Sequence, residues 1–392
     1  MKHVALVIPG LDRIAGAERQ VMAQAKGLRG RGWRVSVVAL SGNGGQAARQ
    51  LTAAGVEFLS LEMRKGLADP RGWIRFSRWL NRERPRVVHA HLPHAAWLAR
   101  WSRLGAPMRG LPRFASSAHV FIDTLHSSST GRLTRRLGYR SSDWLADSVT
   151  AVSQSVADAH LAAGMVDPNK LSVVPNGVDV EDFHPDPSVR ADVRRELGLG
   201  DEFLWLAAGR LEPVKDYPTL LRAFAILPEQ ARLLIAGEGS LQSDLRLLAA
   251  RLGIEGRVRF LGFQPDVKPW MRAADGFVLS SRCEGLPVGL LEAGACALPS
   301  IATDVPGSRE AIVCGRTGRL TPCGAPDALA KAMTAMMLSS PRERCNMGNL
   351  ARLHVTESFS LEAMLDRWEK LYLNLLSRSY QPNRAVQDRV AA

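Results

Sequence analysis

Short runs of consecutive apolar residues recur along this chain, and most are followed by a stretch with helical periodicity. The first run, residues 4–8, contains no polar residue and stops at Pro9-Gly10. An unbroken apolar run predicts a strand buried on both faces, because a strand with one face in water alternates polar and apolar residues. Strands that alternate with helices predict a parallel sheet with right-handed crossovers.

Two series of such elements are present, and the polar, proline-rich segment 181–188 between them is typical of a linker. In the first series, strands are expected over residues 4–8, 35–40, 56–59, 87–90, 114–119, 149–152 and 171–174, and helices over 16–28, 71–82 and 94–104. In the second series, strands are expected over 203–208, 232–236, 258–261, 276–279 and 300–302, and closing helices over 326–338, 342–355 and 361–377.

A chain of 392 residues is long enough for two hydrophobic cores. We therefore predict the α/β class, with two Rossmann-like domains facing a cleft. The N-terminal domain is expected to span residues 1–180, with helix 361–377 packed back on it, and the C-terminal domain residues 181–360.

The net charge of +13 is unevenly distributed. Residues 1–160 contain 24 Lys and Arg against 10 Asp and Glu, whereas the remainder contains 27 against 28. An anionic membrane, a nucleic acid or a polyanionic acceptor would suit this excess, and so would a solvated basic surface without a specific partner.

One segment of the basic half, residues 71–86, alternates arginines with Trp73, Phe76 and Trp79, and four more arginines lie within 131–140. A basic helix studded with aromatic residues can lie on an anionic membrane. The alternative is a helix that buries its apolar stripe and exposes a basic face to water.

The sequence lacks the patterns that are typical of several other classes of protein. No apolar run is long enough for a transmembrane helix and no signal-peptide pattern opens the chain, so a cytoplasmic protein is expected. The five cysteines include no C-x-x-C pair, which favours reduced thiols. No Asp-x-Asp sequence occurs, so we expect neither a metal nor a cofactor. No nucleic-acid-binding signature accompanies the charge, so we expect no nucleic-acid partner.

Ligands of parallel sheets bind beyond the carboxyl ends of the strands, so functional residues should follow strands. Arg210 and Lys215 follow the strand expected at 203–208. A guanidinium fork and an ammonium can neutralise a diphosphate leaving group without a metal ion. In an arbitrary loop they would be ordinary surface charges, so the assignment depends on the neighbouring motifs.

Two carboxylates, Glu284 and Glu292, lie eight positions apart after another expected strand. Gly285, Leu286 and Pro287 lead from the first carboxylate into a helix, because proline is favoured at a helix start. A carboxylate in such a loop can accept hydrogen bonds from sugar hydroxyls, and the helix N-terminus favours phosphate.

Together these segments resemble the retaining glycosyltransferases of family 4, which have the GT-B fold. Further segments similar to that family follow in its order at 174–179, 236–239, 260–262 and 315–318. The resemblance implies that Arg210 and Lys215 bind the donor diphosphate, that Glu284 contacts the donor sugar and that Glu292 binds the ribose. Gly237 and the backbone of 285–287 would line the same donor site.

On the acceptor side, Gly16 and Glu18 follow the first strand in a loop similar to the family's Gly-Gly-x-Glu, with Ala15 in place of the first glycine. The Gly16 amide at the helix start could still meet phosphate. Glu18 is a candidate for acceptor binding.

Histidines complete the expected site. The resemblance implies a histidine that faces the donor sugar, and His119 at the end of the strand expected at 114–119 is assigned to it. His126 is a rival for that place, and His91 and His126 are candidates on the acceptor side. His89 is taken as mainly structural.

The expected function is retaining transfer of a sugar from a nucleotide-diphosphate sugar, a UDP-sugar, to a lipid-linked or cell-envelope glycan in lipopolysaccharide, capsule or exopolysaccharide synthesis. The enzyme would be cytoplasmic and associate with the inner face of the cytoplasmic membrane. A GT-B epimerase or hydrolase of sugar nucleotides is the alternative. A dinucleotide-dependent oxidoreductase is disfavoured, because segment 237–242 lacks the third glycine of G-x-G-x-x-G.

Overall fold

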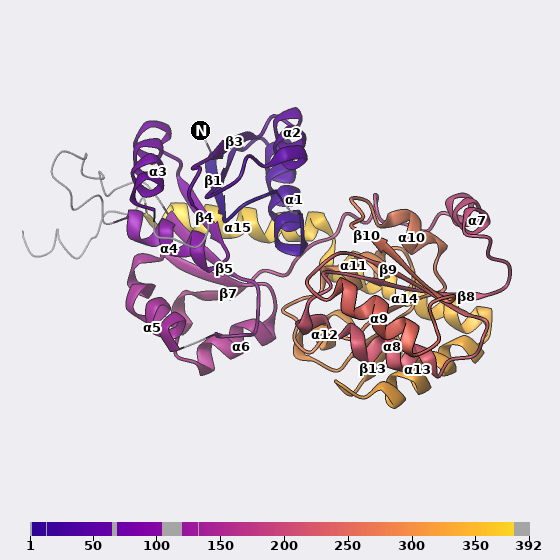
Figure 1. Cartoon of the computed structure of the whole chain (residues 1–392). Coiled ribbons are helices and arrows are strands. Elements are labelled where there is room, and N and C mark those ends of the chain that lie inside the picture. Colours follow the sequence, from indigo (N-terminus) through magenta and orange to yellow (C-terminus); the bar gives the residue numbers. More distant parts are fainter. Residues whose placement is uncertain (1, 13, 65–68, 104–119, 132, 380–392) are drawn as a thin grey trace, which may run out of the picture. The chain divides into compact units, whose positions relative to one another are not determined.

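The computed structural model describes residues 2–12, 14–64, 69–103, 120–131 and 133–379. The chain divides into two compact units, one of Met1–Val174 with Met364–Ala392 and one of Pro175–Ala363 (Figure 1). Each unit is a parallel sheet flanked by helices, which confirms the predicted α/β class and Rossmann-like architecture.

The N-terminal unit contains a seven-stranded parallel sheet in the order β3-β2-β1-β4-β5-β6-β7. Its strands are β1 (His3–Ile8), β2 (Arg34–Ala39), β3 (Glu57–Ser60), β4 (Val87–His91), β5 (Val120–Leu125), β6 (Ser148–Ala151) and β7 (Leu171–Val173). Its helices are α1 (Gly16–Gly30), α2 (Gly45–Ala53), α3 (Pro70–Glu83), α4 (Pro93–Ser102), α5 (Leu133–Ser142), α6 (Gln154–Ala162) and most of α15 (Leu361–Ser379). All of β1 is buried, as its apolar run predicts.

Polar contacts distinguish the two faces of this sheet. On one face, Gln24 of α1 donates to the hydroxyl of Tyr372 of α15 at 2.7 Å, and that hydroxyl lies 2.6 Å from Nδ1 of His89 on β4. On the other face, Arg100 of α4 forms a fully buried ion pair with Asp123 of β5. The helices α1 and α15 therefore share one face of the sheet, and α4 covers the other.

The strand expected at 114–119 lies outside the described residues. The strand that pairs with both β4 and β6 is β5, in a segment for which no strand was predicted. Asp123 and Thr124 interrupt its apolar pattern, but both are buried and have tertiary partners in Arg100 and His89. Such partners cannot be recognised from local sequence.

The C-terminal unit contains a six-stranded parallel sheet in the order β10-β9-β8-β11-β12-β13. Its strands are β8 (Phe203–Ala208), β9 (Ala231–Ala236), β10 (Val258–Gly262), β11 (Gly276–Leu279), β12 (Ser300–Thr303) and β13 (Gly318–Thr321). Its helices are α7 (Pro187–Glu196), α8 (Tyr217–Ala225), α9 (Gln242–Arg251), α10 (Lys268–Ala273), α11 (Val288–Ala295), α12 (Pro306–Ala311), α13 (Pro326–Leu338) and α14 (Pro341–Phe359). The short edge strand β13 was not predicted.

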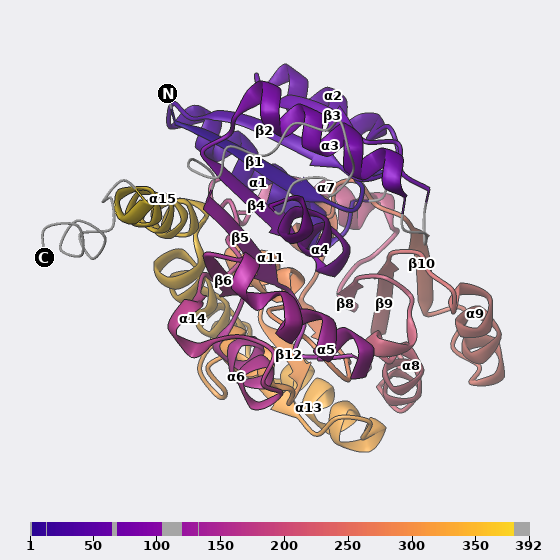
Figure 2. The ribbon, with the colours of Figure 1, turned by 90° about the vertical axis from the view of Figure 1, so that its left-hand side faces the viewer.

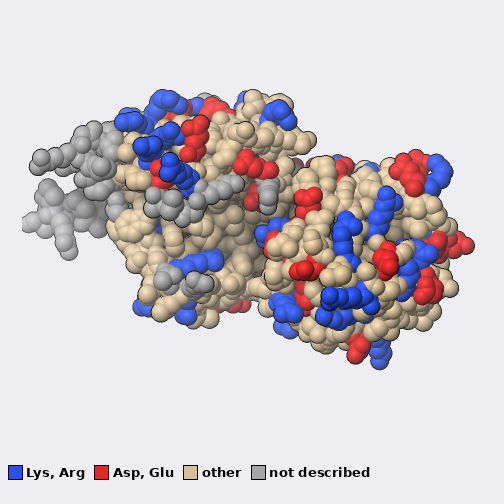
Figure 3. Space-filling model, viewed as in Figure 1, with Lys and Arg blue, Asp and Glu red and all other residues tan. Residues whose placement is uncertain are grey.

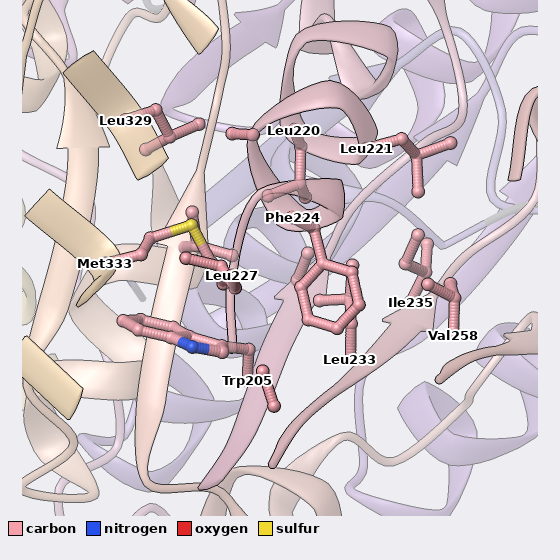
Figure 4. Close-up of a cluster of buried hydrophobic side chains, with 14 of the residues drawn as sticks. Trp205, Leu220, Leu221, Phe224, Leu227, Leu233, Ile235, Val258, Leu329 and Met333 are labelled. Atoms are coloured by element: carbon pink, nitrogen blue, oxygen red, sulfur yellow. The ribbon is translucent and has the colours of Figure 1, made fainter. Parts of the chain in front are cut away.

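A large apolar core lies between the second sheet and helices α8 and α13 (Figure 4). Leu220 and Phe224 of α8 and Met333 of α13 are fully buried there, together with Trp205 of β8 and Ile235 of β9. Burial of side chains of this size contributes about 1.5–3 kcal/mol each. This packing holds the central strand β8 in place and with it the loop that follows.

The expected linker is more ordered than its composition suggests. Helix α7 begins at Pro187, because the Asp186 carboxylate caps it by accepting from the N–H groups of Ser188 and Val189 at 3.0 and 3.1 Å. Helices α14 and α15 follow one another at the gold end of the chain (Figure 2). Arg352 of α14 donates to the Val180 carbonyl at 3.1 Å and so fastens the segment that precedes α7.

Candidate active site

The candidate donor residues of the C-terminal unit follow three neighbouring strands. Arg210 and Lys215 follow β8, Gly237 follows β9, and Glu284 follows β11. Strand β8 lies between the other two, and the strand order reverses there. The carboxyl ends of these parallel strands meet at a topological switch point, which is where α/β sheets bind ligands.

The turns after β8 and β9 approach so closely that Gly237 has no room for a side chain. Its φ is +143°, and a Cβ would lie 2.0 Å from the carbonyl oxygen of Gly209. The Gly209 N–H donates to the Ala236 carbonyl at 2.9 Å. Arg210 follows directly and is exposed to solvent.

Lys215 and Glu284 form an ion pair that joins the turn after β8 to the loop after β11. Nζ of Lys215 lies 2.5 Å from Oε1 of Glu284, and the two side chains are 18% and 10% exposed. The Ser281 hydroxyl donates to the same carboxylate oxygen at 2.5 Å. The pair therefore offers a fixed cation for an anionic ligand and a fixed carboxylate for hydroxyl groups.

Three residues that the sequence interpretation left without a role hold this pair in position. Asp216 is buried with a φ of +47°, and its Oδ2 lies 3.0 Å from Nε of Arg282. The Ser280 hydroxyl donates to the Lys215 carbonyl at 2.8 Å. Both contacts join the turn after β8 to the loop after β11. Nothing in the local sequence marks these partners, because they lie more than sixty positions apart.

The loop that carries Glu284 is held from two sides. The Asn176 side chain is buried and donates to the Leu286 carbonyl at 3.1 Å. On the other side, a Cβ on Gly307 at the start of α12 would lie 2.3 Å from the Gly285 carbonyl oxygen, so the two backbones touch. Asn176 lies in a segment that resembles the family, but its contact with the loop is visible only in the structure.

Helix α11 continues this loop. Pro287 takes the N-cap position, one residue before the first helical residue. Glu292 lies in α11 and is only 6% exposed. A carboxylate this deeply buried needs polar partners, so its place is unlike that of an ordinary surface charge on a helix.

In the N-terminal unit, the order of the strands in the sheet reverses between β1 and β4. The loop after β1 lies at this switch point. Gly16 begins α1, and the Glu18 carboxylate accepts from the Ala15 N–H at 3.1 Å. Glu18 therefore caps its own helix, a structural role that the sequence interpretation did not include.

Two histidines meet at the carboxyl ends of neighbouring strands. His91 ends β4 and His126 follows β5, and Nδ1 of His91 lies 3.2 Å from Nε2 of His126. Burial lowers the pKa of His126 to about 4 and lowers the pKa of His91 well below its usual range. Both rings are therefore neutral at pH 7. The Nε2 of His91 is buried and has no hydrogen-bond partner among the described residues.

The other histidines have different positions. His89 is fully buried, and its Nε2 lies 2.6 Å from the Thr124 hydroxyl, so it is a structural residue. His119 lies outside the described residues.

Among the residues that the structure describes, no group of three or more His, Cys, Asp or Glu could hold a metal ion. In the same part of the chain, no helix combines the length and the apolar character needed to cross a bilayer.

Comparison with known proteins identifies the class. Residues 14–182 match the family described as Glycosyltransferase Family 4, and residues 189–354 match Glycosyl transferases group 1. The chain is 31% identical over 306 residues to the N-acetyl-alpha-D-glucosaminyl L-malate synthase of Bacillus anthracis, covering 75% of this chain and 76% of the relative. It is 26% identical over 325 residues to the UDP-Gal:alpha-D-GlcNAc-diphosphoundecaprenol alpha-1,3-galactosyltransferase of Escherichia coli, covering 79% and 81%.

The fold agrees with this class. The structure of Anabaena HepE in complex with UDP-glucose superposes with a TM-score of 0.83 at 21% identity, covering 95% of this chain and 99% of HepE. The protein is a glycosyltransferase with the GT-B fold. It belongs to glycosyltransferase family 4, and its C-terminal part to the group 1 glycosyl transferases.

Proposed function

We propose that this glycosyltransferase takes its sugar from a nucleotide-diphosphate donor, a UDP-sugar, and transfers it with retention of anomeric configuration. The Escherichia coli relative is named for UDP-Gal, and Anabaena HepE was solved with UDP-glucose. The ion pair at the switch point of the second sheet supports the proposal, because a diphosphate sugar carries both an anion for Lys215 and hydroxyls for Glu284.

In this proposal the donor exchanges partners with the existing ion pair. The diphosphate takes the ammonium of Lys215, and the carboxylate of Glu284 becomes free to accept from the sugar hydroxyls. The guanidinium of Arg210 and the N-terminus of α11 add positive potential. Charge on the phosphate grows as the glycosidic bond breaks, so these contacts are stronger in the transition state than in the ground state.

The remaining donor contacts in this proposal are those that the resemblance to the family implies. Glu292 in α11 binds the ribose, and the backbone of Gly237 and of Gly285 to Pro287 lines the donor. The Gly16 amide at the start of α1 meets a phosphate oxygen. No metal ion enters this scheme, because Arg210 and Lys215 supply the positive charge.

Transfer itself needs no protein nucleophile in this proposal. The bond between the anomeric carbon and the phosphate oxygen breaks with its electron pair on the phosphate. The acceptor hydroxyl attacks the same face, and its proton passes to the leaving phosphate oxygen. Retention follows from attack on the face that the diphosphate leaves.

We propose His126 for the place that faces the donor sugar; His119, to which the resemblance assigned that place, lies outside the described residues and stays a candidate. His126 directly follows β5, and its ring is oriented by His91 at 3.2 Å. Its low pKa keeps it uncharged, so it can hydrogen-bond a sugar hydroxyl without repelling the developing positive charge on the sugar.

The acceptor in this proposal is a lipid-linked or cell-envelope glycan, and the enzyme works in the cytoplasm at the inner face of the membrane. The Escherichia coli relative is named for a diphosphoundecaprenol-linked acceptor. The excess of cations in residues 1–160 suits such an anionic setting. Lipopolysaccharide, capsule or exopolysaccharide synthesis would use such a transfer.

The ion pair between Lys215 and Glu284 is the observation that carries the proposal. A melting-temperature screen with UDP-, GDP- and ADP-sugars identifies the donor, because a ligand that binds the native state raises the melting temperature. With that donor, Lys215→Ala should lower kcat/KM at least about tenfold, or ~1.4 kcal/mol. Lys331→Ala, at an exposed position of α13, is the matched control. Equal kcat/KM for wild type and Lys215→Ala would refute the assignment.

A further inference from the structure

The two basic, aromatic-containing segments of the N-terminal unit have different surfaces. In α3, Phe76, Trp79 and Leu80 are buried, while Arg71 and Arg78 are exposed. The exterior of α3 is therefore polar and basic, as the blue side chains over its region indicate (Figure 3). Phe76 and Trp79 therefore belong to the protein core and are not available to a membrane, while Trp73 is half-buried.

Helix α5 has the opposite character. Leu133 and Leu137 are 65% and 57% exposed, and Trp144 in the 3₁₀ turn that follows α5 is 63% exposed. The buried side of the helix is formed by Tyr139 and Ser142. Because residues three and four apart share a helix face, the exposed side chains form one stripe.

Cations lie on the same stripe. Arg136 and Arg140 are exposed between the apolar residues. The neighbouring acid, Asp143, is directed inward, where it lies 3.8 Å from Lys170 and 3.9 Å from Arg100. The stripe therefore combines large apolar side chains with positive charge, and blue side chains lie among tan ones in the region of α5 (Figure 3).

The hydrogen bonding of Trp144 suits transfer of its side chain from water into an apolar environment. Its indole N–H donates to the Ser141 carbonyl at 3.1 Å. Because that donor is satisfied within the protein, the ring can enter an apolar environment without an unpaired N–H. On the adjacent helix α4, Trp101 is 49% exposed and adds apolar area.

We propose that the α5 surface, formed by Leu133, Arg136, Leu137, Arg140 and Trp144, docks on an anionic lipid bilayer. Leucine and tryptophan side chains enter the boundary between headgroups and acyl chains, and the arginines contact anionic headgroups. The occupant is a lipid surface rather than a protein, because the stripe alternates apolar residues with arginines and exposes no acid.

Docking through α5 also fits the proposed acceptor, and this part of the inference rests on the proposed function. The chain enters α5 shortly after His126, so the amino end of α5 lies toward the edge of the sheet that carries the candidate histidines. A bilayer against α5 would bring a lipid-linked acceptor to that edge.

Sedimentation of the full chain with vesicles of equal parts phosphatidylglycerol and phosphatidylcholine tests the proposal. We expect binding at low salt that weakens at high salt. Each arginine at the surface contributes about 1 kcal/mol, or about fivefold, so Arg136→Gln with Arg140→Gln should weaken binding by about thirtyfold. Leu133→Gln with Leu137→Gln should weaken it at least about tenfold.

The matched control removes the same charge from α3. Arg71→Gln with Arg78→Gln should weaken vesicle binding by less than about threefold, since α3 inserts no apolar side chain. All variants should keep the wild-type melting temperature and UDP affinity. If the wild type did not bind UDP, the proposed function would be contradicted. The vesicle-binding result would still decide whether α5 docks on a membrane.

Three results would overturn the proposal. One is the absence of wild-type vesicle binding at low salt. Another is an equal loss in the α3 and α5 arginine variants, which would mean diffuse electrostatic attraction. The third is a concentration-dependent dimer that Leu133→Gln with Leu137→Gln abolishes, since the surface would then be a contact between protein chains.

Discussion

Replacing Glu284 by glutamine separates the two halves of the proposed donor site. The change keeps the size of the side chain but removes the negative charge 2.5 Å from Lys215. In the free enzyme the diphosphate must displace this carboxylate from the ammonium. UDP, which has a diphosphate but no sugar, should therefore bind more tightly to Glu284→Gln than to the wild type.

The size of the effect follows from the exposure of the pair. Two unit charges 4 Å apart attract by about 4 kcal/mol at an effective dielectric constant of 20, but desolvation and side-chain entropy offset most of this. Partly exposed ion pairs retain about 1 kcal/mol in coupling experiments. The dissociation constant of UDP should thus fall about fivefold in Glu284→Gln. In contrast, kcat/KM with the full donor should fall at least about tenfold, because the sugar loses its charged acceptor.

Calorimetric titration of UDP into the wild type, Glu284→Gln, Lys215→Met and the double variant measures this coupling. The matched control is Glu229→Gln, which lies before β9 at the amino edge of the same sheet and is 86% exposed. The gain in affinity should shrink at high salt. Weaker or unchanged UDP binding by Glu284→Gln at low salt would show that Lys215 and the diphosphate do not meet.

Two further predictions concern the framework of the site. Asn176→Ala removes the donor to the Leu286 carbonyl and should cost about 1–3 kcal/mol in unfolding free energy, measured by chemical denaturation; an unchanged value would mean that water replaces the amide. The folded-state pKa of His126, about 4, lies below its unfolded value, so the unfolded state binds the proton first as the pH falls. The stability that neutral His126 contributes should be complete above about pH 6.5 and decline toward pH 4, by about 1.4 kcal/mol per pH unit. His126→Asn should make this decline shallower than in the wild type, and an identical slope would show that His126 does not titrate as described.

The architecture could be predicted because its signal is local. A strand buried on both faces must be apolar at each position, so β1 and β8 are visible as unbroken apolar runs. The rule that ligands bind beyond the carboxyl ends of strands then directed attention to Arg210, Lys215 and Glu284. The structure brings Lys215 and Glu284 into contact.

Strand β5 was not predicted, for the opposite reason. Asp123 and Thr124 are polar residues in a fully buried strand, and their burial depends on Arg100 and His89 from other elements. A polar residue with a distant partner has the same local appearance as one in a loop.

The two parallel sheets and the charged residues that follow the central strands could be predicted from the sequence, because they depend on periodicity and short-range spacing. The family was indicated by the resemblance of its motifs. Tertiary packing was needed to show that Asn176 and Asp216 support the Lys215–Glu284 pair, and that α3 buries Phe76 and Trp79 while α5 exposes its leucines. Those distinctions depend on which side of each helix meets a neighbouring element. A helix with apolar residues and arginines permits either outcome until the rest of the chain has packed against it.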